Sequence, residues 1–300
     1  MTQRVPQKSE TKQLIEAEYA RRLSGQQGEN ALNYPLSFLP EKDFSILQGL
    51  RLPSKYGYFQ MDTLVLINSF ALIVEAKNFS GTLYFDQEFH QLIRKIAEKE
   101  ESFEDPIIQV ERQKLQLKHW LESNTNSPLP IETLVVISKP STIIKASNLN
   151  VSKKVCHANV LPEKIKYMMK IHTREQIEIK DRKKIVRKLL KANTPLELNI
   201  LKNYHLKKEE IVTGVSCPKC RNIPMKRRKG NWECTSCGHI SKSAHIQAIN
   251  DYFLLLAPTI TNKEFRQFTH LQSRKTAYKL LMEMKLPYSG DKKSRTYFQK

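Results

Sequence analysis

The 300-residue sequence contains no apolar run close to the roughly 20 residues that a membrane-spanning helix requires. Residues 1–13 also lack the apolar stretch of a secretory signal, and no internal repeat or long low-complexity tract is visible. We therefore expect a cytoplasmic protein without a membrane partner. Hydrophobic residues make up 40% of the chain, which is enough for packed cores in two or three domains.

Cysteine is scarce, with five in the chain, and four of them have metal-ligand spacing rather than disulfide spacing. Cys217-Pro-Lys-Cys220 is followed, after thirteen residues, by Cys234-Thr-Ser-Cys237. Paired CxxC turns predict a four-cysteine zinc ribbon, in which structural Zn²⁺ replaces the core that a segment of about 30 residues cannot build. A redox role would need a thioredoxin-like surround, which is absent. We expect Cys156, which stands alone, to be a buried apolar residue.

The segment between the two CxxC pairs carries basic residues beside an aromatic one. Arg227 and Arg228 precede Trp232 by a few positions, a combination that suits phosphate contact and base stacking. The segment resembles the zinc ribbons at the C-termini of bacterial type I topoisomerases. His239 and His245 are alternative ligands, but four cysteines already suffice for a zinc ion.

Two apolar runs, residues 61–68 and 70–77, predict consecutive β-strands. Side chains alternate between the faces of a strand, so Glu75 and Lys77 share one face, and pairing of the strands brings Asp62 to the same edge. A surface hairpin whose polar residues face water is the plain alternative. However, both runs are apolar at nearly every other position, as in central strands, where charges are costly unless they are paired or bound to metal.

Two carboxylates at the end of such a hairpin form a hard, oxygen-rich site that suits Mg²⁺ or Mn²⁺. A neighbouring lysine can position the attacking water and offset charge that develops on a phosphate. Asp62, Glu75 and Lys77 therefore predict a metal-dependent phosphodiesterase, and the pattern resembles the PD-(D/E)xK nucleases.

The surrounding residues resemble one family within that group, the nuclease-related domain (NERD) proteins, over about residues 25–165. The matching motifs, in chain order, are Gly28-Glu29, Asp62, Glu75-Ala76-Lys77-Asn78-Phe79-Ser80-Gly81 and Pro106-Ile107-Ile108-Gln109. The resemblance implies a restriction-endonuclease-like α/β core in which Glu29 is a helical acid and Gln109 a helical amide of the site. Asp105 departs from the family pattern, since asparagine is expected before the proline.

Apolar periodicity predicts the remaining elements of this core. Strands are expected at residues 43–52, 82–85, 88–95, 131–138 and 155–160, and helices at residues 9–23, at 106–121 and from Pro162, with residues 25–28 interrupting the first helix and a short helix beginning near Glu29. This order of elements is typical of an α/β fold with a central mixed sheet.

Charge is distributed unevenly along the chain, which carries a formal net charge of +20. Residues 1–150 contain 17 basic and 18 acidic residues, whereas residues 151–300 contain 33 and 12. This asymmetry favours a catalytic module joined to a phosphate-binding half, with DNA as the partner and RNA as an alternative. Residues 180–191 form a basic helix in which Ile185, Leu189 and Leu190 are expected on one apolar face; a solvated connecting helix and a phosphate-contacting one are equally consistent with the pattern.

The last segment predicts helices at residues 244–256, 261–268 and 273–284, followed by two short extended pieces within 286–299. Thr261 with Glu264 forms a capping-box pattern, and Ser273 is an N-cap candidate. The order is similar to a winged helix-turn-helix, whose third helix enters the major groove and whose wing contacts the backbone. The residues expected to contact DNA are Arg274, Lys275, Tyr278, Lys279, Lys292, Lys293 and Arg295. A small helical cap packed on the core, or a winged helix that binds protein, is the alternative.

Five segments follow from these patterns. They are an N-terminal helix (1–24), a nuclease domain (25–170), a basic helical linker (171–210), a zinc ribbon (211–243) and a winged-helix-like domain (244–300). The predicted function is Mg²⁺-dependent hydrolysis of phosphodiester bonds in DNA. The alternatives are a non-catalytic nucleic-acid-binding or regulatory protein that retains a nuclease fold, and a transcription regulator built on the last domain. The intact set of carboxylates and lysine favours the enzyme.

Overall fold

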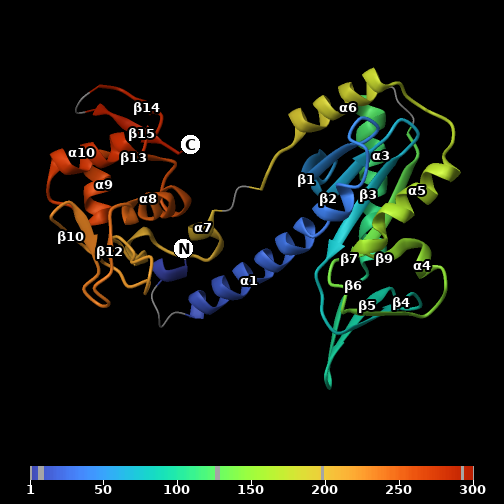
Figure 1. Cartoon of the computed structure of the whole chain (residues 1–300), viewed down its shortest axis with the longest axis horizontal. Helices are drawn as coiled ribbons and strands as arrows, with labels where there is room; N and C mark the ends of the chain where they lie inside the picture. The colour runs from blue at the N-terminus through green and yellow to red at the C-terminus, as the bar shows by residue number, and fades with distance from the viewer. Residues whose placement is uncertain (1, 6–9, 126–128, 197–198, 292–293, 300) are drawn as a thin grey trace. The chain divides into compact units, whose positions relative to one another are not determined.

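The computed structural model describes residues 2–5, 10–125, 129–196, 199–291 and 294–299 (Figure 1). The chain divides into two compact units. The sheet-bearing unit comprises Ala20–Leu196, and the cysteine-bearing unit comprises Met1–Tyr19 together with Glu197–Lys300. No helix in the described residues is both long and apolar enough to cross a bilayer.

The sheet-bearing unit is an α/β domain built on a five-stranded mixed sheet of order β1-β2-β3-β7-β9. The first three strands are antiparallel neighbours, and β3, β7 and β9 run parallel. The strands are β1 (Ser45–Ser54), β2 (Gly57–Leu66), β3 (Ala71–Lys77), β7 (Ile131–Ile137) and β9 (Val155–His157). The central mixed sheet expected from the sequence is confirmed.

Helices cover both faces of this sheet, so each face has its own hydrophobic core (Figure 1). One core contains Leu64 and Ile73 from the strands, with Leu117 of α3 (Pro106–Asn124) and Leu189 of α6 (Ile179–Ala192). The opposite core contains the alternating residues Val65 and Val74, packed against α2 (Asn33–Leu36) and α5 (Leu161–Ile171). Burial on both faces explains why β2 and β3 read as nearly continuous apolar runs.

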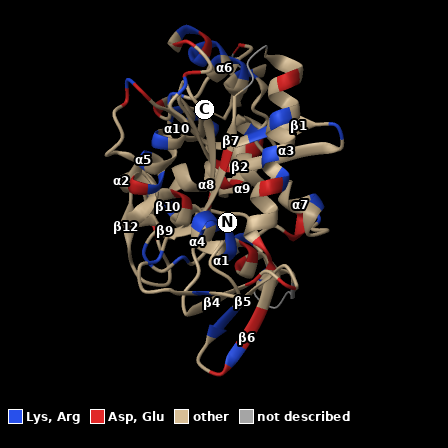
Figure 2. Cartoon of the chain, turned by 90° about the vertical axis from the view of Figure 1, so that its right-hand side faces the viewer, with Lys and Arg blue, Asp and Glu red and all other residues tan. Residues whose placement is uncertain are grey.

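A second sheet, of order β6-β5-β4-β8, packs against β7 and the start of α3. Its strands are β4 (Thr82–Asp86), β5 (Gln91–Ile96), β6 (Lys99–Glu104) and β8 (Ile143–Ala146), and the short helix α4 (Val151–Lys154) and the 3₁₀ turn η2 (Ala158–Val160) flank β9. The sequence predicted no strand at β6, because its residues are mostly charged and alternate with few apolar ones. Figure 2 shows charges of both signs along the β5–β6 hairpin.

Helix α1 (Glu10–Asn30) corrects the expected interruption at residues 25–28, because the helix continues through both glycines. A glycine costs a helix only about 1 kcal/mol, and packing requires one here. A Cβ on Gly28 would lie 2.9 Å from the Cβ of Asn78, whereas Gly25 has open space around it. Gly28 therefore permits a close approach of α1 to the end of β3.

Helix α6, expected within a linker, packs on the sheet through Ile185 and Leu189. Leu190 is exposed, contrary to the expected apolar face, and Arg182 is buried rather than solvated. The Arg182 guanidinium donates hydrogen bonds to the carbonyl oxygens of Lys42 and Asp43. The basic helix is thus anchored to the sheet-bearing unit through one of its cations.

Within its described residues, the cysteine-bearing unit contains two three-stranded sheets and one hydrophobic core. One sheet consists of β10 (Lys226–Arg228), β11 (Asn231–Glu233) and β12 (Ile240–Ser241). The second sheet has the order β13-β15-β14. The elements after the first sheet are α8 (Ala244–Leu255), β13 (Thr259–Thr261), α9 (Asn262–Thr269), α10 (Arg274–Glu283), β14 (Tyr288–Ser289) and β15 (Thr296–Phe298). The predicted capping box at Thr261 and N-cap at Ser273 are confirmed, and strand β13 was not predicted.

Arg4, in the 3₁₀ turn η1 (Thr2–Arg4), is fully buried within the cysteine-bearing unit. Its Nε donates to Asp251 Oδ2 at 2.7 Å, its Nη1 donates to the carbonyl oxygens of Val212 and Gly214, and its guanidinium lies 4.6 Å from the centre of the Phe268 ring. The remaining short elements are α7 (Ile200–Asn203) and η3 (Lys208–Glu210). The N-terminal segment is therefore part of this unit although it is distant in sequence.

Candidate active site and metal centre

Strand pairing brings Asp62 to the end of β3. Thr63 lies opposite Val74, so the next positions toward the edge of the sheet are Asp62 on β2 and Glu75 on β3. The Asp62 Oδ2 accepts a hydrogen bond of 2.9 Å from the backbone amide of Ala76. The two carboxylates are thereby held at the edge that the sequence predicted.

Glu75, Lys77 and Gln109 form a closed triangle of hydrogen bonds. Lys77 Nζ lies 2.8 Å from Glu75 Oε1 and 2.9 Å from Gln109 Oε1, and Gln109 Nε2 donates to Glu75 Oε1 at 2.8 Å. Glu75 is 4% exposed, so these donors satisfy a carboxylate that burial would otherwise penalise. The triangle fixes the Lys77 ammonium at the end of the strand.

Gln113, one turn after Gln109 on α3, was missed by the sequence reasoning. Its Nε2 donates to Glu75 Oε2 at 3.0 Å and to the backbone carbonyl of Gln60 at 3.0 Å. Two amides at positions i and i+4 share one helix face, and this spacing was the signal that could have identified the second one.

Glu29 reaches the same edge of the sheet because Asn78 anchors α1 there. Asn78 Nδ2 donates to the Ser24 carbonyl at 2.7 Å, and Ser138 Oγ donates to Asn78 Oδ1 at 3.1 Å. Together with the close approach at Gly28, this contact turns Glu29 toward the carboxylates of β2 and β3. The glycine and asparagine of the predicted motifs therefore have structural roles in positioning an acid.

The acids interact electrostatically. Burial, followed by the negative charge of Glu75, raises the pKa of Asp62 to about 7, with a smaller contribution from Glu29. Burial and the charge of Glu75 also raise the pKa of Glu29. Like charges held together at a cavity favour a bound cation, because a cation relieves their mutual repulsion.

These side chains line a cavity of about 840 Å³, which we call the acidic cavity and define by Glu29, Asp62, Glu75 and Lys77. Arg94 of β5, which the sequence reasoning also missed, lines the same cavity. Its guanidinium lies 5.3 Å from the ring centre of Phe79 and 5.2 Å from that of Phe103, and it is paired with Glu101 of β6. Its position depends on a hairpin whose second strand the sequence did not predict.

Asp105, the departure from the family pattern, is fully buried and caps α3. Its Oδ1 accepts from the amide of Ile107 at 2.9 Å, and its Oδ2 accepts from Gln87 Nε2 at 2.8 Å. Aspartate thus starts the helix that carries Gln109, as an asparagine cap would.

Gly81, at the end of the E-A-K-N-x-x-G motif, has a φ of 92°, and a Cβ there would lie 2.3 Å from the carbonyl oxygen of Lys95. Only glycine fits this turn between β3 and β4.

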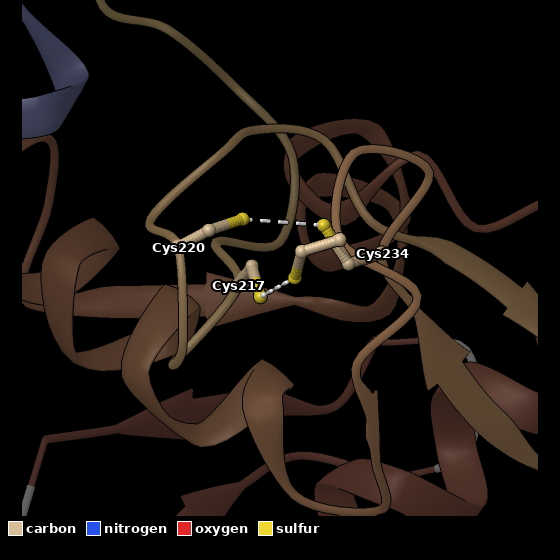
Figure 3. A group of neighbouring side chains, drawn as sticks. Cys217, Cys220 and Cys234 are labelled. Carbon is tan, nitrogen blue, oxygen red and sulfur yellow. Dashed lines mark hydrogen bonds between the residues drawn. The ribbon is translucent and has the colours of Figure 1, made fainter.

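The four cysteines of the two CxxC turns converge in the cysteine-bearing unit (Figure 3). Their sulfur atoms all lie within 4.8 Å of one another, with Cys217–Cys237 at 3.7 Å and Cys220–Cys234 at 3.5 Å. Tetrahedral Zn–S bonds of about 2.3 Å place sulfur atoms roughly 3.8 Å apart, so the group fits a zinc ion. Among the described residues, no other group of three or more potential ligands is this compact.

The environment of Cys234 favours a thiolate. Backbone amides, first that of Cys237 and then that of Ser236, lower the pKa of Cys234 to about 6. Cys156 is buried beside β7, as expected, and burial raises the pKa of its thiol to about 11.

Trp232, expected to stack on bases, is instead a core residue that is 1% exposed. Its Nε1 donates to His245 Nδ1 at 3.2 Å, and burial lowers the pKa of His245 to about 4. Arg227 lies with its guanidinium 5.1 Å from the centre of the Trp232 ring, whereas Arg228 is exposed near Glu233. The indole belongs to the core because β11 alternates and places Trp232 on the inner face.

Four of the residues predicted to contact DNA line one cavity of about 470 Å³ in the cysteine-bearing unit. They are Arg274, Lys275, Tyr278 and Arg295. Arg295 lies 4.2 Å from the ring centre of Tyr288, and Lys279 is exposed near Glu283. Lys292 and Lys293 lie outside the described residues.

Comparison with known proteins gives a match between residues 24–138 and the family described as nuclease-related domain. An uncharacterized protein of Bacillus anthracis is 29% identical over 86 residues, which cover 28% of this chain and 41% of that protein. The chain thus spans about two fifths of the length of the curated relative it matches. No solved structure matches.

Proposed function

We infer from the match between residues 24–138 and the family described as nuclease-related domain that the chain has a nuclease-related function and interacts with nucleic acid. From this starting point, we propose that the chain is a metal-dependent nuclease that hydrolyses phosphodiester bonds in DNA. The observation that carries the proposal is the convergence of Glu29, Asp62, Glu75 and Lys77 on one cavity from three elements of the fold.

Asp62 and Glu75 would hold Mg²⁺ or Mn²⁺, with Glu29 as a further acid, because carboxylate oxygens are the ligands these ions prefer. The mutual repulsion of Glu29, Asp62 and Glu75, which line the same cavity, supports the binding of such an ion. A bound ion would polarise the phosphodiester and lower the pKa of an attacking water.

The side chains of Lys77, Gln109 and Gln113 would assist the carboxylates. Lys77, held at 2.8 Å from Glu75 and 2.9 Å from Gln109, would orient the attacking water and stabilise charge on the phosphate. Gln109 and Gln113 would keep Glu75 in a single orientation by donating to its two oxygens. Precise positioning of such groups contributes strongly to rate.

The cysteine-bearing unit would hold nucleic acid and carry structural Zn²⁺ on Cys217, Cys220, Cys234 and Cys237. The element order α8-β13-α9-α10-β14-β15, with β15 between β13 and β14, supports a winged helix-turn-helix. In that arrangement α10 would carry Arg274, Lys275 and Tyr278 to the DNA. Arg228 on β10 offers an exposed cation for the backbone.

The test is a cleavage assay on plasmid, linear duplex, single-stranded DNA and RNA with Mg²⁺, Mn²⁺ or a chelator of divalent ions. The proposal predicts cleavage of DNA that requires Mg²⁺ or Mn²⁺ and stops when the ion is removed. Tight binding without cleavage of any substrate would support the second candidate, a nucleic-acid-binding protein with a nuclease fold.

A further inference from the structure

A second cavity, of about 1120 Å³, lies on the sheet-bearing unit between the tip of the β1–β2 hairpin and one face of α3. We call it the tyrosine groove and define it by Lys55, Tyr56, Tyr58 and Gln60 of the hairpin and Arg112 and His119 of α3. None of these residues was singled out by a sequence motif.

The tyrosine groove adjoins the acidic cavity. Gln109 and Gln113 line the groove, and both donate hydrogen bonds to Glu75, which lines the acidic cavity. On β2, Tyr58 and Gln60 line the groove, and Asp62, farther along the same strand, lines the acidic cavity. A rise of about 3.3 Å per residue puts Tyr58 roughly 13 Å from Asp62 along the strand. A short stretch of a polymeric ligand can therefore contact the tyrosine groove and the acidic cavity at the same time.

The hairpin tip presents aromatic surface. Tyr56 is 88% exposed and Tyr58 is 50% exposed. Each ring has a cation beside it, with Lys55 Nζ 5.1 Å from the ring centre of Tyr56 and Arg51 Cζ 3.9 Å from that of Tyr58. Aromatic rings for base stacking, together with cations for phosphates, are the means by which proteins bind single-stranded nucleic acid.

The charge of the groove matches the same ligand. Its basic lining residues are Lys55, Arg112 and His119, and no Asp or Glu is among the described residues that line it. Arg112 is paired with Glu104, and both side chains are more than half exposed to solvent. By contrast, the acidic cavity is lined by four carboxylates and three cations, namely Glu29, Asp62, Glu75 and Glu101 with Arg21, Lys77 and Arg94. The cations of the groove thus attract a polyanion. In the acidic cavity, a metal ion would be needed to offset the repulsion between the carboxylates and the phosphates.

We propose that the tyrosine groove binds an unpaired strand of the substrate, with bases stacked on Tyr56 and Tyr58 and the backbone leading to the acidic cavity. This inference rests on the proposed nuclease function, because the groove gains its role from the adjoining site. It narrows the substrate class to single-stranded DNA or to duplexes with a single-stranded tail, since paired bases do not expose their faces to a protein ring.

The test uses the full-length protein, zinc-loaded and with a chelator too weak to remove zinc in place of Mg²⁺, so that binding is measured without cleavage. A deoxyoligonucleotide containing 5-iodouracil is irradiated in the complex, and the attached peptide is identified by mass spectrometry. We expect labelling at Tyr56 or Tyr58 by a single strand and by a tailed duplex, and none there by a blunt duplex of equal length.

Matched variants separate stacking from general binding. The double substitution Tyr56→Phe with Tyr58→Phe should change affinity for single strands and tailed-substrate cleavage less than twofold. Tyr56→Ala with Tyr58→Ala should weaken single-strand affinity or tailed-substrate cleavage by about tenfold or more, the effect of losing stacked bases. Tyr167→Ala, at a 63% exposed tyrosine on α5 that lines neither cavity, should change neither.

Labelling confined to residues 197–300, or equal labelling of Tyr56 and Tyr58 by blunt duplex, would overturn the inference. So would an alanine pair that behaves as the wild type. Labelling is read without catalysis, so a chain that never cleaves DNA but is labelled at Tyr56 retains the strand site and loses only the nuclease proposal.

Discussion

The two units assemble their candidate functional side chains in different ways. In the sheet-bearing unit, the residues of the acidic cavity come from positions as far apart as Glu29 and Glu101, and a buried sheet brings them together. In the cysteine-bearing unit, all four sulfurs come from residues 217–237. A local motif predicts its geometry from spacing alone, whereas a dispersed site depends on packing that only the folded chain reveals.

The two structural units differ less in net charge than the two halves of the sequence do. The sheet-bearing unit contains 27 basic and 19 acidic residues, and the cysteine-bearing unit contains 23 and 11. The net charges are therefore +8 and +12, because the basic helix α6 belongs to the sheet-bearing unit. Phosphate-binding capacity is accordingly expected in both units, in keeping with the tyrosine groove.

Loss of zinc should produce the largest difference between the units. Cys220→Ser should remove about one zinc ion per chain and destabilise the cysteine-bearing unit by several kcal/mol, because zinc binding in small domains supplies about 10–16 kcal/mol toward folding. Elemental analysis and calorimetry measure both effects. The melting of the sheet-bearing unit should not change.

Cys156→Ala is the control for this experiment, since Cys156 lies outside the cluster and should leave zinc content intact. If wild-type protein purified under reducing conditions contains no zinc, the four cysteines do not form a zinc ribbon.

Arg4→Ala should have the next largest effect on stability, because it removes the guanidinium that pairs with the buried Asp251. Breaking a buried ion pair costs about 3–5 kcal/mol. The loss should appear in the melting of the cysteine-bearing unit, to which the N-terminal segment belongs. Lys279→Ala, which removes an exposed i,i+4 pair with Glu283, should cost less than about 1 kcal/mol. Equal melting of the two variants would contradict this placement of the N-terminus.

Gly28→Ala should lower Mg²⁺-dependent cleavage by about ten- to a hundredfold, because the added methyl pushes α1 and Glu29 away from β3. Gly25→Ala is a matched control three residues earlier in the same helix. Its Cβ would meet nothing within 4 Å, so helix stability should rise slightly and cleavage should be retained. Steady-state rates of both variants decide whether the position of Glu29 matters.

The smallest effects are expected among the surface cations of the cysteine-bearing unit. Arg274→Ala with Lys275→Ala should weaken duplex binding a few-fold and reduce the salt slope by about 1–2, since each phosphate contact contributes about one unit. Arg227→Ala with Arg228→Ala should act more on single strands. Binding isotherms at several salt concentrations measure both, and identical profiles for the two pairs would show that the two modules do not divide these substrates.

The sequence predicted the parts of the fold that rest on strong periodicity or on local motifs. The strands containing Asp62 and Glu75, helix α3 and the cysteine cluster all follow patterns that packing reinforces. The uninterrupted helix α1 could not be predicted, because its reason is the contact between Gly28 and Asn78. Trp232, which the sequence suggested as a base-stacking residue, is likewise buried in the core.

The sequence predicted that the acids and the lysine lie together, but it did not identify Arg94 and Gln113 beside them. Arg94 depends on the β5–β6 pairing, and Gln113 depends on the rotation of α3 against β3. The tyrosine groove depends on which face of β2 meets which face of α3, a relation between elements that no single pattern encodes.

Catalysis in the acidic cavity is tested by comparing cleavage and binding in Asp62→Ala, Lys77→Ala and the control Lys95→Ala, whose side chain is half exposed on β5. With Mg²⁺ and a tailed DNA duplex, we expect the first two variants to lose cleavage by about a thousandfold or more while DNA affinity stays within a few-fold of the wild type. Lys95→Ala should cleave normally. Cleavage at the wild-type rate by either Asp62→Ala or Lys77→Ala would contradict the assignment of the acidic cavity as the catalytic site.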